Sequence, residues 1–395
     1  MRSRQFVQPP LEFIPPALDR NILRITRSLF PLWMKFRTPL TKIEGVNVEL
    51  LADLYEKFQS GKVRLLLAFR HPSTLDPFCM MYLMHYLMPQ AAKSQGIRLK
   101  APTHSHFMYD RGIPLWAGTW VGWLYSKLGG TPILRGKLDR TGLKSARDLL
   151  TNGEFPLMAA PEGATNGHNE IVSPLEPGIA QLAFWSMEDL QKADRTEDVV
   201  VVPIGIQYHY ITPPWDEINR LLDDLENSCG ITKDNADRYT RLYRLAEYLL
   251  TLMENFYTKF YHQDLPKVEN ETSNEQLALR LQALMNAGLQ VAEQHFGILP
   301  KGSVIDRCRR LEQAAWDLIF REDLKLDNLS PVERGLADRV AEEASLRIWH
   351  MRLVESFVAV TGKYVFEKPT VDRFAETTLL IWDMLTKIKG GDSFK

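Results

Sequence analysis

His71 and Asp76 are the two residues whose types and spacing most directly indicate chemistry in this chain. They lie in Ala68-Phe-Arg-His-Pro-Ser-Thr-Leu-Asp-Pro77. An aspartate that accepts the Nδ1 proton of a histidine fixes the imidazole tautomer and leaves Nε2 free as a base. No nearby side chain is placed as a protein nucleophile, so the base would act on the hydroxyl of a bound substrate. Taken alone, this spacing is better explained by a loop histidine and a helix-capping aspartate.

The elements around the pair are expected to bring the two side chains together. The mostly apolar run Val63–Phe69 is typical of a buried strand in a parallel sheet, and chemistry is usually placed where such strands end. Pro72 disfavours helix at His71, while Asp76 before Pro77 predicts an N-cap followed by the first helical residue. A helix N-terminus also favours an ionised carboxylate. We therefore expect His71 and Asp76 to face each other across a tight strand-to-helix loop.

Three further blocks follow in order and carry groups suited to binding a polar substrate. Arg135, at the end of an extended Thr-Pro-Ile-Leu stretch that begins after Gly129, places a guanidinium that can clamp a phosphate, and Lys137 adds to the positive field. In Phe155-Pro-Leu-Met-Ala-Ala-Pro-Glu-Gly163, Glu162 has two open roles: to bind an acceptor hydroxyl or to brace the loop of His71. Gly163 permits a positive φ or a close backbone approach.

The last block is Val199-Val-Val-Val-Pro-Ile-Gly205, in which the β-branched run predicts a buried strand ending at Pro203. Together the four blocks, over about residues 43 to 210, resemble the signature of the glycerolipid acyltransferase family. That signature is a His-x4-Asp block, a Gly-led block ending in Arg, a Pro-Glu-Gly block and a hydrophobic strand ending in Pro. The resemblance covers enzymes of the 1-acylglycerol-3-phosphate and glycerol-3-phosphate acyltransferase type.

The resemblance implies a function and assigns roles. The implied reaction moves a fatty acyl group from acyl carrier protein or coenzyme A to a hydroxyl of glycerol phosphate or a lysophospholipid, with no cofactor and no metal. His71 and Asp76 would be catalytic. Substrate binding would fall to the remaining residues of the blocks, namely Gly129, Arg135, Lys137, Glu162 and Gly163.

One departure keeps two alternatives open. Family members often continue Pro-Glu-Gly-Thr-Arg, whereas this chain has Ala164-Thr165-Asn166 and no second basic residue. One alternative is an acyltransferase for a non-phosphorylated acceptor, and the other is a non-catalytic lipid-binding or scaffold protein.

Composition limits the partners and the compartment. The 395 residues are 45% hydrophobic and 25% charged, which is ordinary for a globular protein, and a net charge of −1 predicts no nucleic-acid binding. The three cysteines have no C-x-x-C spacing and indicate a reducing compartment. No signal peptide and no membrane span are evident. His104 and His106 share a predicted strand face, but the pair lacks further ligands and is expected to be structural. A cytoplasmic protein is predicted.

Charge is concentrated at the N-terminus. Residues 1 to 42 contain eight basic and two acidic residues, a net charge of +6. Leu18, Ile22, Ile25 and Leu29 recur at helical spacing, with arginines on the opposite face and a break expected at Pro31. A basic amphipathic helix of this kind binds anionic membrane surfaces, which predicts peripheral association with a lipid surface. The alternative is a helix packed on the protein's own core with its arginines in water.

The order of expected elements predicts the fold class. Between 43 and 214, strands near 63–69, 98–103, 131–134, 155–160 and 199–206 alternate with helices near 48–60, 77–88, 115–128, 140–152 and 176–191. This alternation predicts a layered α/β acyltransferase-type domain with a mixed, mostly parallel sheet. Residues 1–42 form the basic arm, and 215–395 are expected to form an all-α bundle. The bundle has apolar helix stripes but no residue that selects its role.

Overall fold

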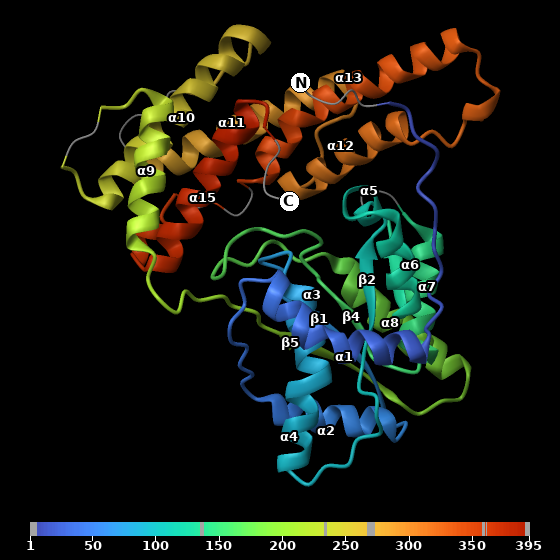
Figure 1. Ribbon diagram of the computed structural model, residues 1–395. Coiled ribbons are helices and arrows are strands. Elements are labelled where there is room, and N and C mark those ends of the chain that lie inside the picture. Colours follow the sequence, from blue (N-terminus) through green and yellow to red (C-terminus); the bar gives the residue numbers. More distant parts are fainter. Residues whose placement is uncertain are drawn as a thin grey trace. The chain divides into compact units, whose positions relative to one another are not determined.

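Two compact units make up the computed structural model (Figure 1), which describes residues 6–134, 138–232, 235–266, 273–357, 360 and 362–391. The α/β unit comprises Leu11–Thr165 and Pro174–Gln207. The helical unit comprises the described residues of Met1–Pro10, Asn166–Ser173 and Tyr208–Lys395. The chain therefore enters the helical unit at Tyr208, slightly ahead of the boundary expected at 214. The segment Asn166–Ser173, which follows the Pro-Glu-Gly block, also clusters with the helical unit.

A five-stranded sheet forms the centre of the α/β unit. Its strands are β1 (Val63–Phe69), β2 (His106–Asp110), β3 (Gly130–Ile133), β4 (Leu157–Ala159) and β5 (Asp198–Ile204), in the order β3-β2-β4-β1-β5. All pairings between these strands are parallel, so the described sheet lacks the antiparallel part that a mixed sheet would have. Because parallel strands end at the same edge, His71 after β1 and Glu162 after β4 lie at one edge, on neighbouring strands.

Two strand predictions need correction. Residues 98–103 do not form a strand: Pro102 has no N–H to donate, and the hydroxyl of Thr103 is engaged with the Met84 carbonyl at 2.7 Å. The strand begins instead at His106. β5 is a strand as predicted, but it is not buried, because it lies at the sheet edge and Val201 is 44% exposed. An edge position tolerates Pro203, which cannot donate to a ladder.

Helices cover both faces of the sheet. Residues Val63, Leu65, Leu67 and Phe69 of β1 pack in a cluster with α2 (Val48–Gln59), α3 (Asp76–Tyr82) and α4 (Met88–Ser94). Leu66 points to the opposite face, where α7 (Arg140–Asn152) and α8 (Pro177–Lys192) pack. This alternation follows from the two-residue period of a strand. The short helices α5 (Ile113–Ala117) and α6 (Thr119–Lys127) precede β3.

The helix predicted near 77–88 is a methionine-rich core element, but it is not one regular helix. Met80, Met84 and Met88 are almost fully buried in the cluster against β1. A π-helical turn, Leu83–Leu87, separates α3 from α4. Flexible thioether side chains fill such irregular core space well. The layer behind the His71 loop is therefore tightly filled by methionine.

The helix expected in the basic arm is continuous and belongs to the α/β unit, whereas the described residues of Met1–Pro10 belong to the helical unit. Helix α1 (Arg20–Arg37) contains Pro31, so the predicted break there is wrong. Proline in a helix interior removes one hydrogen bond, and packing can compensate for that loss. Here Leu23, Phe30 and Met34 are buried, and the Phe30 ring lies against Phe78 of α3 with centroids 6.5 Å apart. These contacts hold both halves of the helix on the same unit.

Helices account for all regular structure described in the second unit apart from one isolated bridge. They are α9 (Trp215–Cys229), α10 (Arg238–Tyr261), α11 (Ser273–Phe296), α12 (Val304–Ile319), a 3-10 turn (Leu326–Asn328), α13 (Pro331–Glu355), α14 (Tyr364–Glu367) and α15 (Val371–Ile388). A capping box formed by Ser330 and Glu333 is present at the start of α13. A second box, formed by Ser303 and Asp306, opens α12. The predicted helical C-terminal region is confirmed.

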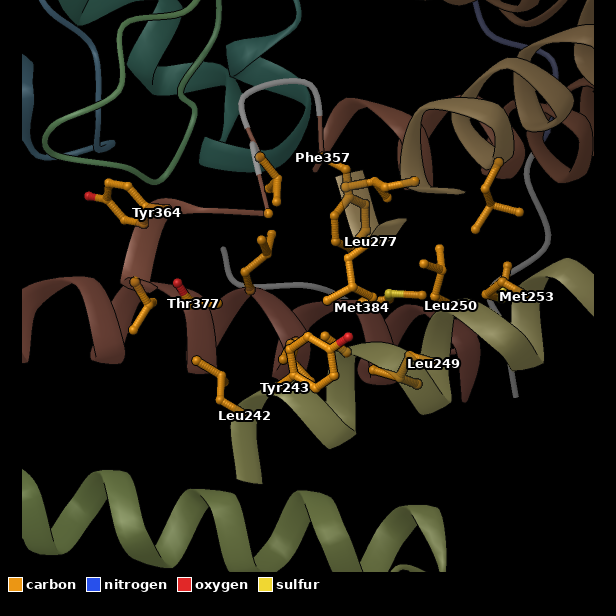
Figure 2. Close-up of a pocket in the computed structure, with 18 of the residues that line it drawn as sticks. Leu242, Tyr243, Leu249, Leu250, Met253, Leu277, Phe357, Tyr364, Thr377 and Met384 are labelled. Atoms are coloured by element: carbon orange, nitrogen blue, oxygen red, sulfur yellow. The ribbon is translucent and has the colours of Figure 1, made fainter. Parts of the chain in front are cut away.

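A cavity lies inside this helical unit. Its volume is about 150 Å³, and side chains of α10, α11 and α13 to α15 line it together with His168 (Figure 2). Most lining side chains are aliphatic, methionine or aromatic. A void of this size is unusual, because protein interiors are close-packed and hold few voids larger than a water molecule.

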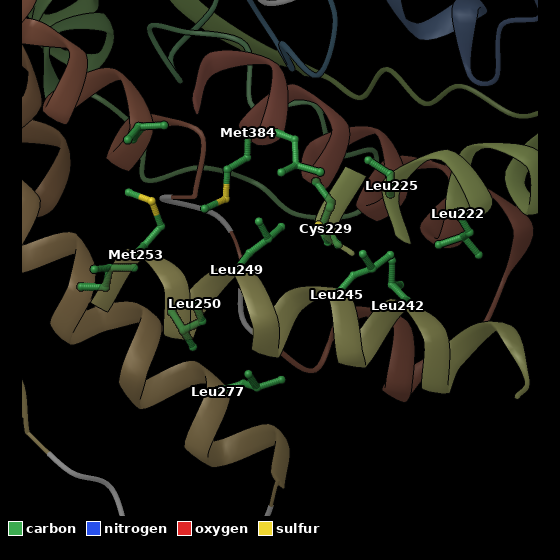
Figure 3. Close-up of a cluster of buried hydrophobic side chains, with 14 of the residues drawn as sticks. Leu222, Leu225, Cys229, Leu242, Leu245, Leu249, Leu250, Met253, Leu277 and Met384 are labelled. Atoms are coloured by element: carbon green, nitrogen blue, oxygen red, sulfur yellow. The ribbon is translucent and has the colours of Figure 1, made fainter. Parts of the chain in front are cut away.

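The apolar core of the helical unit is built from the facing stripes of its helices. Leu222 and Leu225 of α9, Leu245 and Leu249 of α10, and Met384 of α15 belong to one buried cluster (Figure 3). Residues stepping by threes and fours along α10 supply this stripe, which confirms the periodicity seen in the sequence. Burial of such stripes is the dominant stabilising term for a helical unit.

Candidate active site

His71 and Asp76 form a close pair at the carboxyl end of β1. His71 Nδ1 lies 2.9 Å from Asp76 Oδ2. The Asp76 side chain is fully buried, whereas that of His71 is 22% exposed. Since a carboxylate oxygen only accepts, this contact places the proton on Nδ1 and the lone pair on Nε2. Among the described residues, none is hydrogen-bonded to Nε2, so the base position of the ring is left for a ligand.

The position of Asp76 differs by one residue from the predicted N-cap. Leu75 is the N-cap of α3, Asp76 is its first residue and Pro77 follows. The carboxylate does not cap the helix. Its Oδ2 instead accepts the backbone N–H of Ser73 at 2.8 Å while facing His71. The helix therefore starts one residue early, and the aspartate is turned back into the loop, where two donors converge on one oxygen.

Glu162 braces the loop that carries His71. Its Oε1 accepts the backbone N–H of His71 at 2.9 Å and lies 3.5 Å from Arg70 Nε. The Glu162 side chain is fully buried. These contacts arise because β4 pairs with β1, so their exits are adjacent. Of the two roles left open for Glu162, the bracing contact is present. Arg70 was not predicted as its partner, although it directly precedes His71 in the sequence.

The two glycines predicted to bind substrate occupy opposite edges of the sheet. Gly163 has φ +71° and its N–H donates to the Ala160 carbonyl at 3.1 Å, which forms a tight turn beside Glu162. Gly129 has φ +79° and precedes β3, so it lies at the amino edge, away from His71. Its carbonyl accepts from His106 Nδ1 at 3.0 Å, and an added Cβ would lie 2.5 Å from that ring. Gly129 therefore packs against His106 at the edge opposite His71, and the prediction that it binds substrate there is not supported by its position.

The predicted phosphate-binding residues Arg135 and Lys137 lie outside the described residues. Arg111, which directly follows β2, is a described cation at the carboxyl edge of the sheet. It pairs with Asp139 and lies over the Phe13 ring at 5.4 Å. Asp139 also accepts the Leu134 N–H at 2.8 Å. Asp139 was not predicted as a site residue, although it stands directly before the first residue of α7, where a capping carboxylate is common.

The remaining histidines discussed above are structural. His104 lies between His85 and the Leu128 carbonyl, at 3.0 and 2.9 Å, and burial lowers the pKa of His104 to about 4. Burial also lowers the pKa of His106. His168 bonds the Asn166 carbonyl within the helical unit at 2.7 Å. The described residues contain no group of three or more side chains suited to holding a metal.

Comparison with protein families gives one decisive match. Residues 46–207 match the model of the family described as Acyltransferase. Residues 46–207 are an acyltransferase domain. The match includes all five strands and the His71, Asp76 and Glu162 cluster, and it ends before α9. The acyltransferase domain predicted from the ordered blocks is thus confirmed over these residues, and the domain implies transferase activity. Comparisons with curated proteins and with solved structures found no match.

Proposed function

We propose that the acyltransferase domain moves a fatty acyl group from a thioester of acyl carrier protein or coenzyme A to a hydroxyl of glycerol phosphate or a lysophospholipid. A reaction of 1-acylglycerol 3-phosphate, in phospholipid biosynthesis or remodelling, fits best. The observation that carries this proposal is the 2.9 Å contact between His71 Nδ1 and the buried Asp76 at the carboxyl edge of the sheet. No cofactor or metal enters the reaction as proposed.

In the proposed reaction, His71 Nε2 takes the proton of the acceptor hydroxyl as its oxygen attacks the thioester carbonyl. The resulting tetrahedral intermediate collapses by breaking the carbon–sulfur bond, and the imidazolium returns its proton to the leaving thiolate. The buried Asp76 orients the ring and stabilises the imidazolium in between. Positioned acid–base catalysis of this kind contributes roughly 10²–10⁴-fold.

Two backbone N–H groups of the loop that carries His71 are bonded to carboxylates and do not face the substrate as donors. Donors aimed at the developing oxyanion are usually backbone N–H groups. Two N–H groups of the loop are already engaged: that of His71 with Glu162 and that of Ser73 with Asp76. Both contacts fix the loop relative to its two carboxylates. The oxyanion donors must therefore come from other groups at this edge.

Recognition of the acceptor phosphate is assigned to Arg135 and Lys137 in this proposal, beside Glu162 and Gly163. Arg70 and Arg111, two described cations near these strand exits, face the carboxylates of Glu162 and Asp139. Thr165 takes the place of the basic residue that family members often have two positions after the glycine of Pro-Glu-Gly. This observation favours the second candidate, an acyltransferase for a non-phosphorylated acceptor.

An acceptor panel separates the candidates. Purified protein is incubated with acyl-coenzyme A or acyl carrier protein thioester and with 1-acylglycerol 3-phosphate, glycerol 3-phosphate or monoacylglycerol. The proposal expects a phosphorylated acceptor to be preferred, with a larger rise in acceptor KM than donor KM in Arg135→Ala. Arg220→Ala, at an exposed arginine of α9, is the matched control. Equal use of monoacylglycerol would support the second candidate, and no transfer to any acceptor would leave only a lipid-binding or scaffold role.

We also propose that α1 places the domain on an anionic lipid surface. Beyond its buried face, the helix exposes a second apolar face formed by Ile25, Leu29, Leu32 and Phe36, which are 58–72% exposed. These residues step by threes and fours and so share one side of the helix. Exposed Arg24 and Lys35 lie beside that face. An apolar face flanked by cations suits the headgroup layer of an anionic membrane.

Vesicle sedimentation tests the lipid surface. The described helices include none that is both long and apolar enough to span a bilayer. If α1 is the docking face, Ile25→Gln with Leu29→Gln should reduce partition to anionic vesicles by about 10-fold or more. Leu50→Gln is the control, because Leu50 is a single exposed leucine on α2, 62% exposed. Equal losses in both variants would count against α1 as the docking face.

A further inference from the structure

The cavity of the helical unit has the lining of a site for a single hydrocarbon chain. Leu249 and Met253 of α10, Leu277 of α11 and Met384 of α15 are among its walls (Figure 2). A cavity of about 150 Å³ lined by such side chains accommodates a group of roughly the size of benzene. Fused ring systems are larger than this. A flexible chain fits better, and methionine side chains adapt readily to such ligands.

The polar groups that line the cavity are nearly all engaged with protein partners. The Tyr257 hydroxyl lies 2.9 Å from His350 Nδ1. The Tyr239 hydroxyl donates to Asn274 Oδ1 at 2.8 Å. At the side of α14, the Tyr364 hydroxyl donates to Glu376 Oε2. Because these groups are already hydrogen-bonded to protein partners, they would contribute little polar attraction to a ligand.

Thr377 is the exception. Its Oγ1 is buried, and in the described part of the chain it has no hydrogen-bond partner. Figure 2 shows Thr377 on the wall of the cavity, where α15 runs past Tyr364. A buried hydroxyl without a partner is costly, so such a group in a native protein needs an explanation. A ligand with one hydrogen-bonding atom next to its apolar chain would satisfy it.

The charge around Thr377 selects the kind of head group. The described lining residues include no lysine or arginine. Next to Thr377, burial raises the pKa of the Glu376 carboxyl, because a charged form is poorly solvated there. A free fatty-acid carboxylate would be buried here with no cation among the described lining residues to balance its charge. The neutral carbonyl of an acyl ester or thioester avoids this cost and accepts a hydrogen bond from the threonine hydroxyl.

We infer that the helical unit binds one short acyl chain in this cavity, with the acyl carbonyl accepting a hydrogen bond from Thr377 and the rest of the molecule outside. The ligand class is a short-chain acyl ester or thioester with a neutral carbonyl. This site lies within the helical unit and contains none of the residues proposed for catalysis. It is a second lipid site, and its existence does not depend on the proposed transfer reaction.

Isothermal titration calorimetry with monohexanoylglycerol, an ester with a short acyl chain, measures occupancy in the full-length protein. Ala246→Phe places an aromatic ring in the cavity, since Ala246 of α10 lines it. The matched control is Leu252→Phe on the same helix, at a residue that is 41% exposed and outside the lining. We expect at least a 10-fold weaker affinity in Ala246→Phe and less than a twofold change in Leu252→Phe. Equal affinities in the two variants would overturn the assignment.

Thr377→Val provides a test that does not depend on filling the cavity. Loss of the hydroxyl should weaken monohexanoylglycerol binding by about 5-fold, the value of one hydrogen bond, without lowering the melting temperature of the ligand-free protein. Unchanged affinity, or hexanoate binding more tightly than monohexanoylglycerol at pH 8, would contradict the neutral-carbonyl assignment. His71→Ala should bind normally. Loss of transfer with intact binding therefore separates failure of the proposed reaction from failure of this inference.

Discussion

In the part of the chain that the structure describes, each unit has a histidine–aspartate pair with the same short contact, and the two pairs differ in burial and in position. In both, Nδ1 lies 2.9 Å from Oδ2. In the α/β unit, Asp76 is fully buried and His71 is 22% exposed. In the helical unit, Asp372 and His209 are 18% and 61% exposed. Contact distance alone therefore does not distinguish a catalytic pair from a surface pair.

Position and burial make the difference. Asp76 is five residues from His71, at the exit of a central strand, whereas Asp372 is distant in sequence from His209. Each carboxylate also accepts a backbone N–H, from Ser73 and from Tyr210. Exposed pairs such as His209 and Asp372 contribute roughly 0–1 kcal/mol and are screened by salt. A buried carboxylate in a fixed loop instead dictates the ring's tautomer and orientation. The comparison predicts large effects from one pair and almost none from the other.

Replacing the aspartate of each pair by asparagine is expected to affect kcat very differently. Asp76→Asn should lower kcat by 100-fold or more, because an amide can present an N–H to Nδ1 and favour the wrong tautomer. Asp372→Asn, the matched change, should stay within twofold. Steady-state transfer assays of both variants provide the measurement. A similar loss in both would show that the strand-exit position has no special role.

A smaller effect is expected from the brace beneath His71. Glu162→Gln keeps an oxygen that accepts the His71 N–H and should cost about 10-fold in kcat/KM through the lost charge near Arg70. Glu162→Leu leaves a buried N–H without a partner and should also destabilise the protein by about 1–3 kcal/mol. Thermal unfolding with activity separates the two contributions. Full activity in Glu162→Leu would contradict the claim that Glu162 positions the loop that carries His71.

The smallest effect concerns the segment that follows the Pro-Glu-Gly block. A hydrogen bond from Arg373, assisted by Lys368, lowers the pKa of Glu170. A carboxyl group whose pKa is lowered in the folded state stabilises the fold at pH values above the ordinary carboxyl pKa. This stabilisation is lost as the pH falls through the folded-state pKa. Glu170→Gln should therefore lower the melting temperature by about 1 °C at pH 7.5, and the difference should narrow towards pH 3.5. The surface change Glu217→Gln controls for charge.

The same contrast explains what the sequence could predict. His71, Asp76 and Glu162 follow short apolar runs, so local rules place them at strand exits. The start of β2 and the continuity through Pro31 depend on packing partners distant in sequence, and both were missed. The cavity beside Thr377 was also missed, because a leucine facing a void has the same sequence pattern as one in a filled core. Arg135 and Lys137 stay predictions.

The most direct test compares single-turnover acyl transfer by His71→Ala and His209→Ala, with thermal unfolding to confirm that both variants fold. The account predicts a loss of at least 10² in His71→Ala and wild-type rates in His209→Ala. Transfer by folded His71→Ala at the wild-type rate would contradict the claim that this imidazole is the base.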